Sequence, residues 1–430
     1  MREMKDSGIQ WLGEYPSDWN LIKIKYVLKE RVEKNNPVRT SDILSLTAKQ
    51  GVIPYEEKEG GGNKPKEDVS AYRLAYPGDI VMNSMNILSG SVGLSKFFGC
   101  VSPVYYMLRP QNKKEDVRYY NYIFQTEVFQ KSLFGLGNGI LIKESGNGKL
   151  NTIRMRIPMD KFGELYIPVA PIATQHSIST YLDAKCSEID ALTSDIQSQI
   201  DTLEQYKRSV ITEAVTKGLD RNVEMKESGM QWVGKMPAHW DCIRGKYILK
   251  YMQKPIREND GVITCFRDGE VTLRSNRRED GFTMSDKEIG YQGIDVGDLV
   301  VHGMDGFAGS IGISDSRGKA SPVLNVLDTD QNKKYIMYYL RSMAYGDVFM
   351  ALATGIRVRS CDLRWNKLAE LMYPVPPVTE QEQIVEYIDN ILEKTNALID
   401  EKKDQLSTLD AYKKSLIYEY VTGKKEVPAV

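Results

Sequence analysis

Two long stretches of the chain space their large side chains with the period of a helix. From Thr174 to about Lys217 the sequence contains neither proline nor glycine, and the spacing alternates between three and four residues. This is the heptad pattern of a coiled coil. The predicted seam consists of Leu182, Lys185, Ile189, Leu192, Ile196, Gln199, Leu203, Tyr206 and Val210, and in a second stretch of Ile388, Ile391, Thr395, Leu398, Lys402, Gln405, Leu409, Tyr412 and Leu416.

Each stretch has recognisable helix ends. Thr174 and Thr379 follow proline-rich turns and are candidate N-caps, while Gly218 and Gly423 close the helices. A helix of about 44 residues is about 65 Å long and needs a partner for its apolar stripe. The pattern favours antiparallel pairing of the two helices, with Gln199 and Gln405 buried in the seam. The alternative is that each helix packs only on its own globular domain.

The regions 16–166 and 237–372 have a different pattern. Short apolar runs, such as Asp79–Met82, Val104–Leu108 and Asp298–Val301, are bounded by glycine, proline and asparagine and predict strands. Helical patterns cover Val117–Phe134 and Tyr335–Ala344. The predicted class is α+β, with two globular α+β domains joined by two long antiparallel coiled-coil helices. The expected boundaries are 1–166 for the first globular domain, 167–218 for the first long helix, 219–372 for a linker and the second globular domain, and 373–430 for the second long helix and tail.

The chain also repeats itself at about half its length. Residues 4–29 and 225–250 are identical at 14 of 26 positions without a gap, and 167–216 resembles 373–422. Between them Gly90–Ser95 matches Gly309–Ser314. This period is far too long for a solenoid, whose repeats are about 20–50 residues. We therefore expect a tandem duplication with pseudo-two-fold symmetry, which suits a nearly two-fold ligand such as duplex DNA.

Composition narrows the class of protein. The net charge is −1, and 41% hydrophobic and 27% charged residues are typical of a soluble protein. No apolar run approaches the roughly 18 residues that a membrane span needs. Five scattered cysteines and three histidines argue against zinc sites and a disulfide framework. A cytoplasmic location fits these features.

Motifs of catalysis are not found in the sequence. Gly229–Lys235 resembles a phosphate-binding loop, but Met236 stands where serine or threonine is required, and no strand precedes it. Gly135–Gly139 is glycine-rich, yet it follows a helix and lacks the dinucleotide-binding spacing. The Asn-Pro-Pro-aromatic motif of amino-methyltransferases, a Ser/His/Asp pattern and HExxH are not present either. Carboxylates are plentiful, so a nuclease-like cluster stays open as an alternative, but no spacing singles one out.

Basic residues gather in loop-rich segments of both globular regions. Arginine reads guanine and asparagine reads adenine in the major groove, while lysine mostly contacts phosphate. The alternative is an ordinary solvated charged face. The candidate DNA-binding residues are Asn63, Lys64, Lys66, Lys143, Lys149, Arg154 and Arg156 in the first half, and Arg267, Arg274, Arg277, Arg278, Arg357 and Arg359 in the second.

The two halves differ most in these same loops. The linkers and long helices agree closely, but 30–76 differs almost completely from 251–294, and 131–160 from 345–367. Shared parts are expected to form a common scaffold. Two different short DNA half-sites would explain why the loops differ.

Three features together resemble a known family. They are the duplicated SGxxWxGxxPxxW box at Ser7–Trp19 and Ser228–Trp240, the P-x-P-P-x-x-E-Q start of a long helix at Pro374–Gln381, and the Arg267–Arg274 stretch. The first helix departs from this pattern because Pro168–Gln175 lacks the glutamate. In these features, and in their order along essentially the whole chain, the protein resembles the specificity subunit of type I restriction-modification systems.

The resemblance implies a non-catalytic subunit with two target-recognition domains, each reading one half of a bipartite double-stranded DNA site. The paired helices would set the gap between the halves. Two methyltransferase (modification) subunits and the restriction, or translocase, subunits would dock on this chain, and S-adenosylmethionine, ATP and Mg would act on those partners. The alternatives are a duplicated protein–protein scaffold without DNA readout and a self-contained restriction or modification enzyme.

Overall fold

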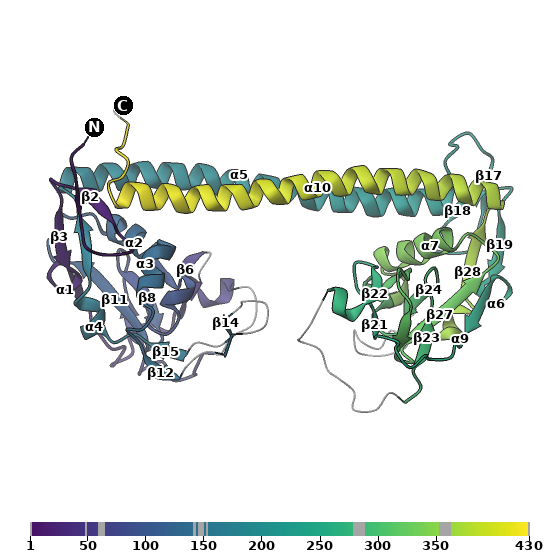
Figure 1. The fold of residues 1–430 in the computed structure, drawn as a ribbon, viewed down its shortest axis with the longest axis horizontal. Helices are drawn as coiled ribbons and strands as arrows, with labels where there is room; N and C mark the ends of the chain where they lie inside the picture. The colour runs from purple at the N-terminus through teal and green to yellow at the C-terminus, as the bar shows by residue number, and fades with distance from the viewer. Residues whose placement is uncertain are drawn as a thin grey trace. The chain divides into compact units, whose positions relative to one another are not determined.

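The computed structural model describes residues 2–47, 50–58, 65–140, 143–144, 150–151, 154–277, 289–351 and 363–428. Its contacts divide the chain into two compact units (Figure 1). Unit 1 comprises Met1–Asp195 and Asp404–Val430, and unit 2 comprises Ile196–Lys403. Each unit thus contains one globular part and portions of both long helices.

A four-stranded antiparallel sheet forms the centre of each globular part. In unit 1 the order is β4 (Leu28–Glu30), β11 (Tyr105–Pro110), β8 (Ile80–Asn83) and β9 (Val92–Leu94). In unit 2 it is β20 (Leu249–Met252), β27 (Leu324–Thr329), β24 (Leu299–His302) and β25 (Ile311–Ile313). The central strands are buried on both faces, which agrees with their continuous apolar sequences.

The helices that follow β11 and β27 differ from the prediction in one place. In unit 1, α2 (Val117–Gln125) ends at Thr126 and α3 (Glu127–Ser132) begins after it, because Thr126 has an extended backbone. The single helix predicted over Val117–Phe134 is therefore wrong. In unit 2, α7 (Lys333–Tyr345) contains the predicted helix and is followed by α8 (Val348–Ala351).

The remaining strands form antiparallel pairs. In unit 1 these are β1 (Met4–Asp6) with β2 (Glu14–Pro16), β3 (Asn20–Lys23) with β16 (Tyr166–Val169), β5 (Leu44–Thr47) with β6 (Gly51–Pro54), β7 (Arg73–Ala75) with β10 (Gly99–Val101), β12 (Asn138–Ile140) with β15 (Arg154–Arg156), and β13 (Lys143–Glu144) with β14 (Leu150–Asn151). In unit 2 they are β17 (Met225–Glu227) with β18 (Lys235–Pro237), β19 (Asp241–Arg244) with β28 (Met372–Val375), β21 (Ile263–Cys265) with β22 (Val271–Leu273), and β23 (Gln292–Ile294) with β26 (Gly318–Ala320). Short helices complete the units: α1 (Ile24–Val27), α4 (Met159–Gly163), α6 (Gly245–Ile248) and α9 (Trp365–Leu368).

The two long helices are α5 (Ile172–Lys217) and α10 (Val378–Val421). They run antiparallel within each unit. In unit 1 the Lys413 ammonium lies 2.6 Å from the Asp190 carboxylate, and in unit 2 Lys402 bonds to Gln199. The predicted α+β class with two long antiparallel helices is thus confirmed.

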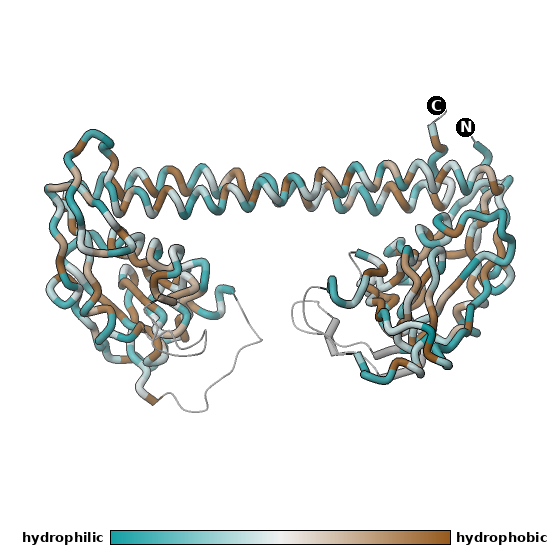
Figure 2. Tube along the Cα trace, turned by 180° about the vertical axis from the view of Figure 1, so that it is seen from behind, coloured by the Kyte–Doolittle hydropathy of each residue, from teal (hydrophilic) through white to brown (hydrophobic). Residues whose placement is uncertain are grey.

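The seam between the helices is only half as predicted. Leu182, Ile189 and Ile196 are buried, but Leu192 and Tyr206 are each 47% exposed. On α10, Leu398 and Tyr412 are exposed in the same way. Three buried positions each lie one residue after a predicted one: Cys186 and Ile200 on α5 and Ile399 on α10. Figure 2 shows hydrophobic residues recurring along both helices.

The helix ends also differ in part from the prediction. α5 begins two residues before Thr174 and α10 begins one residue before Thr379, so both threonines lie inside the first turn and are not N-caps. The glycines at the other end behave as expected, because Gly218 has φ +73° and Gly423 has φ +72°. This left-handed conformation favours glycine after a helix. Gln199 is exposed and accepts its bond from Lys402, so the prediction that it is buried in the seam is wrong.

The duplicated box forms the same structure in both units. In unit 1 the N-terminal segment covers the end of α10, where the Tyr418 hydroxyl donates to the Trp11 and Leu12 carbonyls at 3.1 and 3.3 Å. Arg2 lies 3.8 Å from Glu426, which places the two ends of the chain side by side (Figure 1). In unit 2, Trp240 of the internal copy closes on Gly218 after α5. The N-terminal segment therefore covers the end of α10 in unit 1, just as the linker covers the end of α5 in unit 2.

A buried tyrosine ties each globular part to both long helices. The Tyr119 hydroxyl of α2 lies 3.1 Å from the Pro168 and Val421 carbonyls. The Tyr335 hydroxyl of α7 lies 3.2 Å from the Val215 carbonyl and 3.0 Å from the Pro374 carbonyl. Both rings are fully buried. Each hydroxyl thus joins the last turn of one helix to the strand that leads into the other.

Replacing either tyrosine by phenylalanine is expected to lower the free energy of unfolding of its unit by about 2 kcal/mol, because two buried carbonyls lose their shared donor. Urea unfolding of Tyr119→Phe and Tyr335→Phe measures this loss. Tyr412→Phe, which alters a half-exposed tyrosine, is the control and should change stability by less than about 0.5 kcal/mol. Equal effects in all three variants would contradict the role of the buried hydroxyls.

Candidate nucleic-acid interface

The described candidate residues of unit 1 lie outside its central sheet, in short strand pairs and in the segment before β7. Lys66 is exposed, and its backbone N–H donates to the Tyr72 hydroxyl at 3.2 Å. Lys143 belongs to β13, and Arg154 and Arg156 belong to β15, whose pairing with β12 aligns Arg156 with Asn138. The Arg156 side chain is exposed. The remaining candidates of this half, Asn63, Lys64 and Lys149, lie outside the described residues.

The candidate residues of unit 2 gather on the β21–β22 hairpin. Arg267 is in its turn, and Arg274 and Arg277 follow β22. Arg274 Nε donates to the Thr264 hydroxyl at 3.3 Å, which holds its guanidinium against the neighbouring strand. The remaining candidates of this half, Arg278, Arg357 and Arg359, lie outside the described residues.

Two of these arginines already form salt bridges with carboxylates of the same unit. Arg277 Nη1 lies 2.7 Å from Asp268 and 2.8 Å from Glu270, and its guanidinium stacks 4.2 Å from the centre of the Phe266 ring. The hydrogen bond to Asp268 raises the pKa of Arg277, which keeps the guanidinium fully charged. Arg267 pairs with Asp305 at 3.2 Å, although its side chain is 64% exposed. A phosphate or a base edge would have to displace these carboxylates.

Sequence reasoning missed the pairing carboxylates, although the sequence contains a signal for them. Asp268 and Gly269 form the Asp-Gly pair typical of a hairpin turn, and Gly269 has φ +89°. A hairpin predicted from this pair would have placed Asp268 and Glu270 at its turn, close to the arginines of the same hairpin; in the observed register Phe266 lies opposite Glu270.

A second group of arginines in unit 1 was also missed. Arg31, Arg39 and Arg109 surround the Tyr76 ring, with guanidinium carbons 4.3, 6.0 and 6.0 Å from its centre. The fully buried Asp79 carboxylate accepts from Arg109 and lies 3.4 Å from Arg31. Arg109 is on β11 and Arg31 directly follows β4, so the pairing of these strands brings Arg109 close to the segment that holds Arg31 and Arg39.

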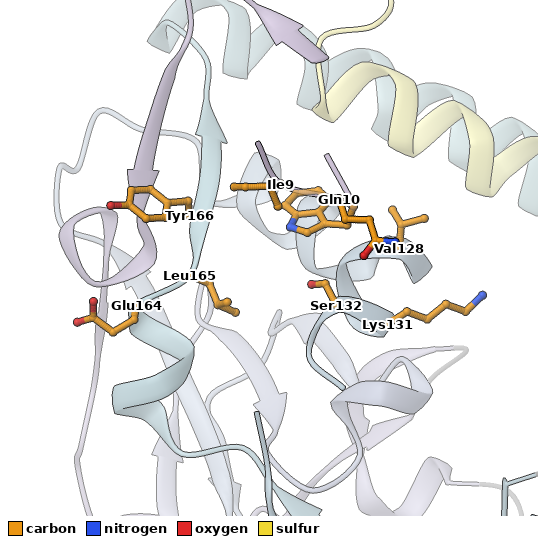
Figure 3. Close-up of a pocket in the computed structure, with 9 residues that line it drawn as sticks. Ile9, Gln10, Val128, Lys131, Ser132, Glu164, Leu165 and Tyr166 are labelled. Carbon is orange, nitrogen blue, oxygen red and sulfur yellow. The ribbon is translucent and has the colours of Figure 1, made fainter. Parts of the chain in front are cut away.

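A groove of unit 1 lies between the N-terminal segment, α3 and β16. It has a volume of about 620 Å³, and its lining includes Ile9, Trp11, Val128, Glu164 and Tyr166 (Figure 3). The Trp11 ring packs edge-on against Phe129, 5.3 Å between centres. Within the described parts of the chain, histidine, cysteine, aspartate and glutamate do not gather in threes that could hold a metal ion, and no helix is long and apolar enough to cross a membrane.

Comparison with known proteins places this fold. No family model matches the chain. It is similar to the MjaX protein of Methanocaldococcus jannaschii, assigned as a type I restriction enzyme specificity subunit, with 23% identity covering 97% of this chain and 96% of that protein. It is also similar to the MjaVIII specificity subunit of the same organism, with 25% identity over 54% of this chain and 50% of that protein.

The fold agrees with a solved structure. A chain from a structure that describes complex assembly and conformational transition of the type I restriction-modification system aligns with a TM-score of 0.67 at 12% identity, covering 96% of this chain and 99% of that chain. The fold of the protein is therefore similar to that of this solved chain. Together with the curated relatives, it confirms the resemblance to type I specificity subunits.

Proposed function

We propose that this chain is the DNA-recognition subunit of a type I restriction-modification complex. The observation that carries the proposal is the duplicated unit: two copies of one α+β fold share their frame and differ in their basic loops. Each unit reads one half of a bipartite target, with base edges giving sequence choice and phosphates giving affinity. The long helices set the gap between the half-sites.

In this proposal the chain itself is not an enzyme. Modification subunits, two per complex, supply methyl transfer from S-adenosylmethionine, and restriction subunits use ATP and Mg. The chain acts in the cytoplasm as the scaffold on which these subunits assemble. The methylated base must leave the duplex to react, and this subunit positions the DNA for that step. The methylated positions in the source genome are expected to reveal the bipartite motif.

The predicted DNA contacts are the basic candidates that lie within the described parts of the differing loops. In unit 1 they are Lys66, Lys143, Arg154 and Arg156, and in unit 2 they are Arg267, Arg274 and Arg277. The candidates outside the described residues, Asn63, Lys64, Lys149, Arg278, Arg357 and Arg359, stay predictions from sequence alone.

A salt titration tests DNA binding directly. Affinity of the chain, with and without modification subunits, for random-sequence duplex is expected to fall steeply with salt, because each neutralised phosphate adds about 0.9 to the slope of log affinity against log salt. If binding is absent even at low salt, the chain is a protein–protein scaffold instead. DNA cleavage or methyl transfer by the purified chain alone would favour the self-contained enzyme.

Removing two exposed cations tests the loops of unit 1. The variant Lys66→Ala/Arg156→Ala is expected to weaken binding to random DNA about tenfold and to lower the salt slope by about 1–2, as two phosphate contacts require. Lys113→Ala is the matched control, since Lys113 is an exposed lysine in the turn before α2. A loss as large in Lys113→Ala would mean that overall charge, rather than the loops, determines binding.

A further inference from the structure

One exposed tyrosine occurs at the same position in both units. Tyr26 of α1 is 65% exposed and Tyr247 of α6 is 75% exposed. They occupy equivalent places in the sequences Lys25–Lys29 and Lys246–Lys250. An exposed ring adds little to folding, because the favourable term comes from burying it. Tyrosine is, however, enriched where proteins bind one another, since it offers a large rigid surface with a polar tip.

The same charged groups surround both rings. The Lys25 ammonium lies 5.0 Å from the centre of the Tyr26 ring, and Lys246 lies 5.5 Å from that of Tyr247. One carboxylate fixes each lysine. In unit 1, Glu164 accepts from Lys25 and lies 2.7 Å from Lys23.

Unit 2 has the same salt-bridge arrangement, with an arginine in place of one lysine. Glu370 lies 3.1 Å from both Lys246 and Arg244, and Arg244 takes the place of Lys23. Hydrogen bonds from the two lysines lower the pKa of Glu164 to about 2, and the bond from Lys246 lowers the pKa of Glu370. Both carboxylates are therefore ionised at neutral pH and attract the neighbouring cations.

Backbone contacts make these groups one surface. In unit 1 the Ile24 N–H donates to the Leu165 carbonyl at 2.8 Å, which joins α1 to the segment after α4. In unit 2 the Gly245 N–H donates to the Leu371 carbonyl at 2.9 Å. A further exposed lysine follows on α4 and near the end of α9. We call the set the tyrosine patch: Lys23, Lys25, Tyr26, Lys161 and Glu164 in unit 1, and Arg244, Lys246, Tyr247, Lys367 and Glu370 in unit 2.

The patch is basic, and all of its residues except Lys367, the last residue of the differing segment 345–367, lie outside the differing loops. Each copy contains three cations and one carboxylate. In Figure 1, α1 and α4 lie on the side of unit 1 opposite β14, and α6 lies on the side of unit 2 opposite β21 and β22. In unit 1 the patch adjoins the 620 Å³ groove, because Glu164 belongs to both (Figure 3). DNA held by the differing loops of a unit would therefore not cover the patch of that unit.

We infer that the tyrosine patch is a docking surface for two copies of one protein subunit, each presenting an acidic surface with an apolar socket for the tyrosine ring. A single partner can use both copies because the patch is the same in both units, whereas the loops are different. The inference rests on the proposed function, which supplies the partner: the modification subunit of the same system.

The test measures how many modification subunits bind the full-length chain. Wild type is expected to bind two in native mass spectrometry. Lys25→Glu/Tyr26→Ala should bind one, and the four-residue variant that adds Lys246→Glu/Tyr247→Ala should bind none at concentrations that saturate wild type. Loss of a central aromatic and reversal of a charge are expected to weaken each site at least about tenfold. Phe134→Ala removes a 56% exposed ring from unit 1 and is the control that should still bind two.

Several outcomes would overturn the inference. If wild type binds no modification subunit, the scaffold role and the patch are both wrong. If wild type and the four-residue variant each bind two, only the patch is wrong. If the variant instead loses affinity for random DNA in the absence of partner, the patch binds phosphates. Tyr26→Phe/Tyr247→Phe, which retains the ring and the fold, should still bind two, and unchanged thermal unfolding of every variant excludes misfolding.

Discussion

Deleting four residues from each long helix is expected to shorten the gap between the two half-sites by one to two base pairs. At about 1.5 Å per residue the deletion removes about 6 Å, or roughly two base pairs at 3.4 Å each. Four residues also turn a helix about 40° beyond a full turn, and one base pair of duplex turns about 35°. The lost length and the lost rotation therefore both predict a gap that is shorter by one to two base pairs.

The antiparallel pairing determines which residues to remove. Because Gln199 bonds to Lys402, segments 198–201 and 400–403 lie opposite each other. Removing both segments shortens one interval between buried seam residues on each helix to three residues and leaves the other intervals unchanged. Such a change only overwinds the helix pair locally. Removing one segment alone would displace every later pair of residues in the seam.

The measurement is binding to duplexes that carry the two half-sites, taken from the genomic methylation map, at gaps from three base pairs shorter to one longer than natural. The variant should prefer a shorter gap by at least about tenfold, while Gln199→Ala/Lys402→Ala keeps the natural gap. A folded deletion variant that still prefers the natural gap would refute the role of the helices in spacing.

The sequence predicted the long helices well because their physical cause is local. Forty-four residues without proline or glycine, bounded by Gly218 and Gly423, permit little else. The seam was harder to predict. Starting from Leu182 and Ile189, the intermediate position can be Lys185 or Cys186, and spacing alone allows both. The prediction followed the large side chains of Leu192 and Tyr206, whereas the structure buries Cys186 and Ile200 and leaves Leu192 and Tyr206 exposed.

The candidate interface was predicted less completely, for a different reason. A basic loop is visible in sequence, but the charge it presents depends on what its turns bring close. Arg277 reads as a free cation in sequence, yet the hairpin places Asp268 and Glu270 within 2.8 Å of it. The Arg31, Arg39 and Arg109 cluster around Tyr76 arises from pairing of distant strands and gave no local signal.

Neutralising the two carboxylates that hold Arg277 is expected to strengthen DNA binding about tenfold. Asp268→Asn/Glu270→Gln retains the shape of the hairpin, because an asparagine oxygen can still accept from the Glu270 backbone N–H as Asp268 does at 3.1 Å. The change removes two negative charges near the proposed phosphates and releases the guanidinium from its ion pairs. The salt slope should rise by about 1, as one additional phosphate contact requires.

A double-mutant cycle separates release of Arg277 from a general loss of negative charge. In the wild-type background Arg277→Ala should weaken binding by about tenfold, within the 1–3 kcal/mol typical of one specific contact. In the neutralised background the loss should be larger, because there Arg277 no longer has to leave its carboxylates. Asp315→Asn alters an exposed carboxylate next to the hairpin and should leave the Arg277→Ala effect unchanged. If Arg277→Ala has no effect in either background, Arg277 is a structural brace of the hairpin, and DNA readout by unit 2 depends on other residues.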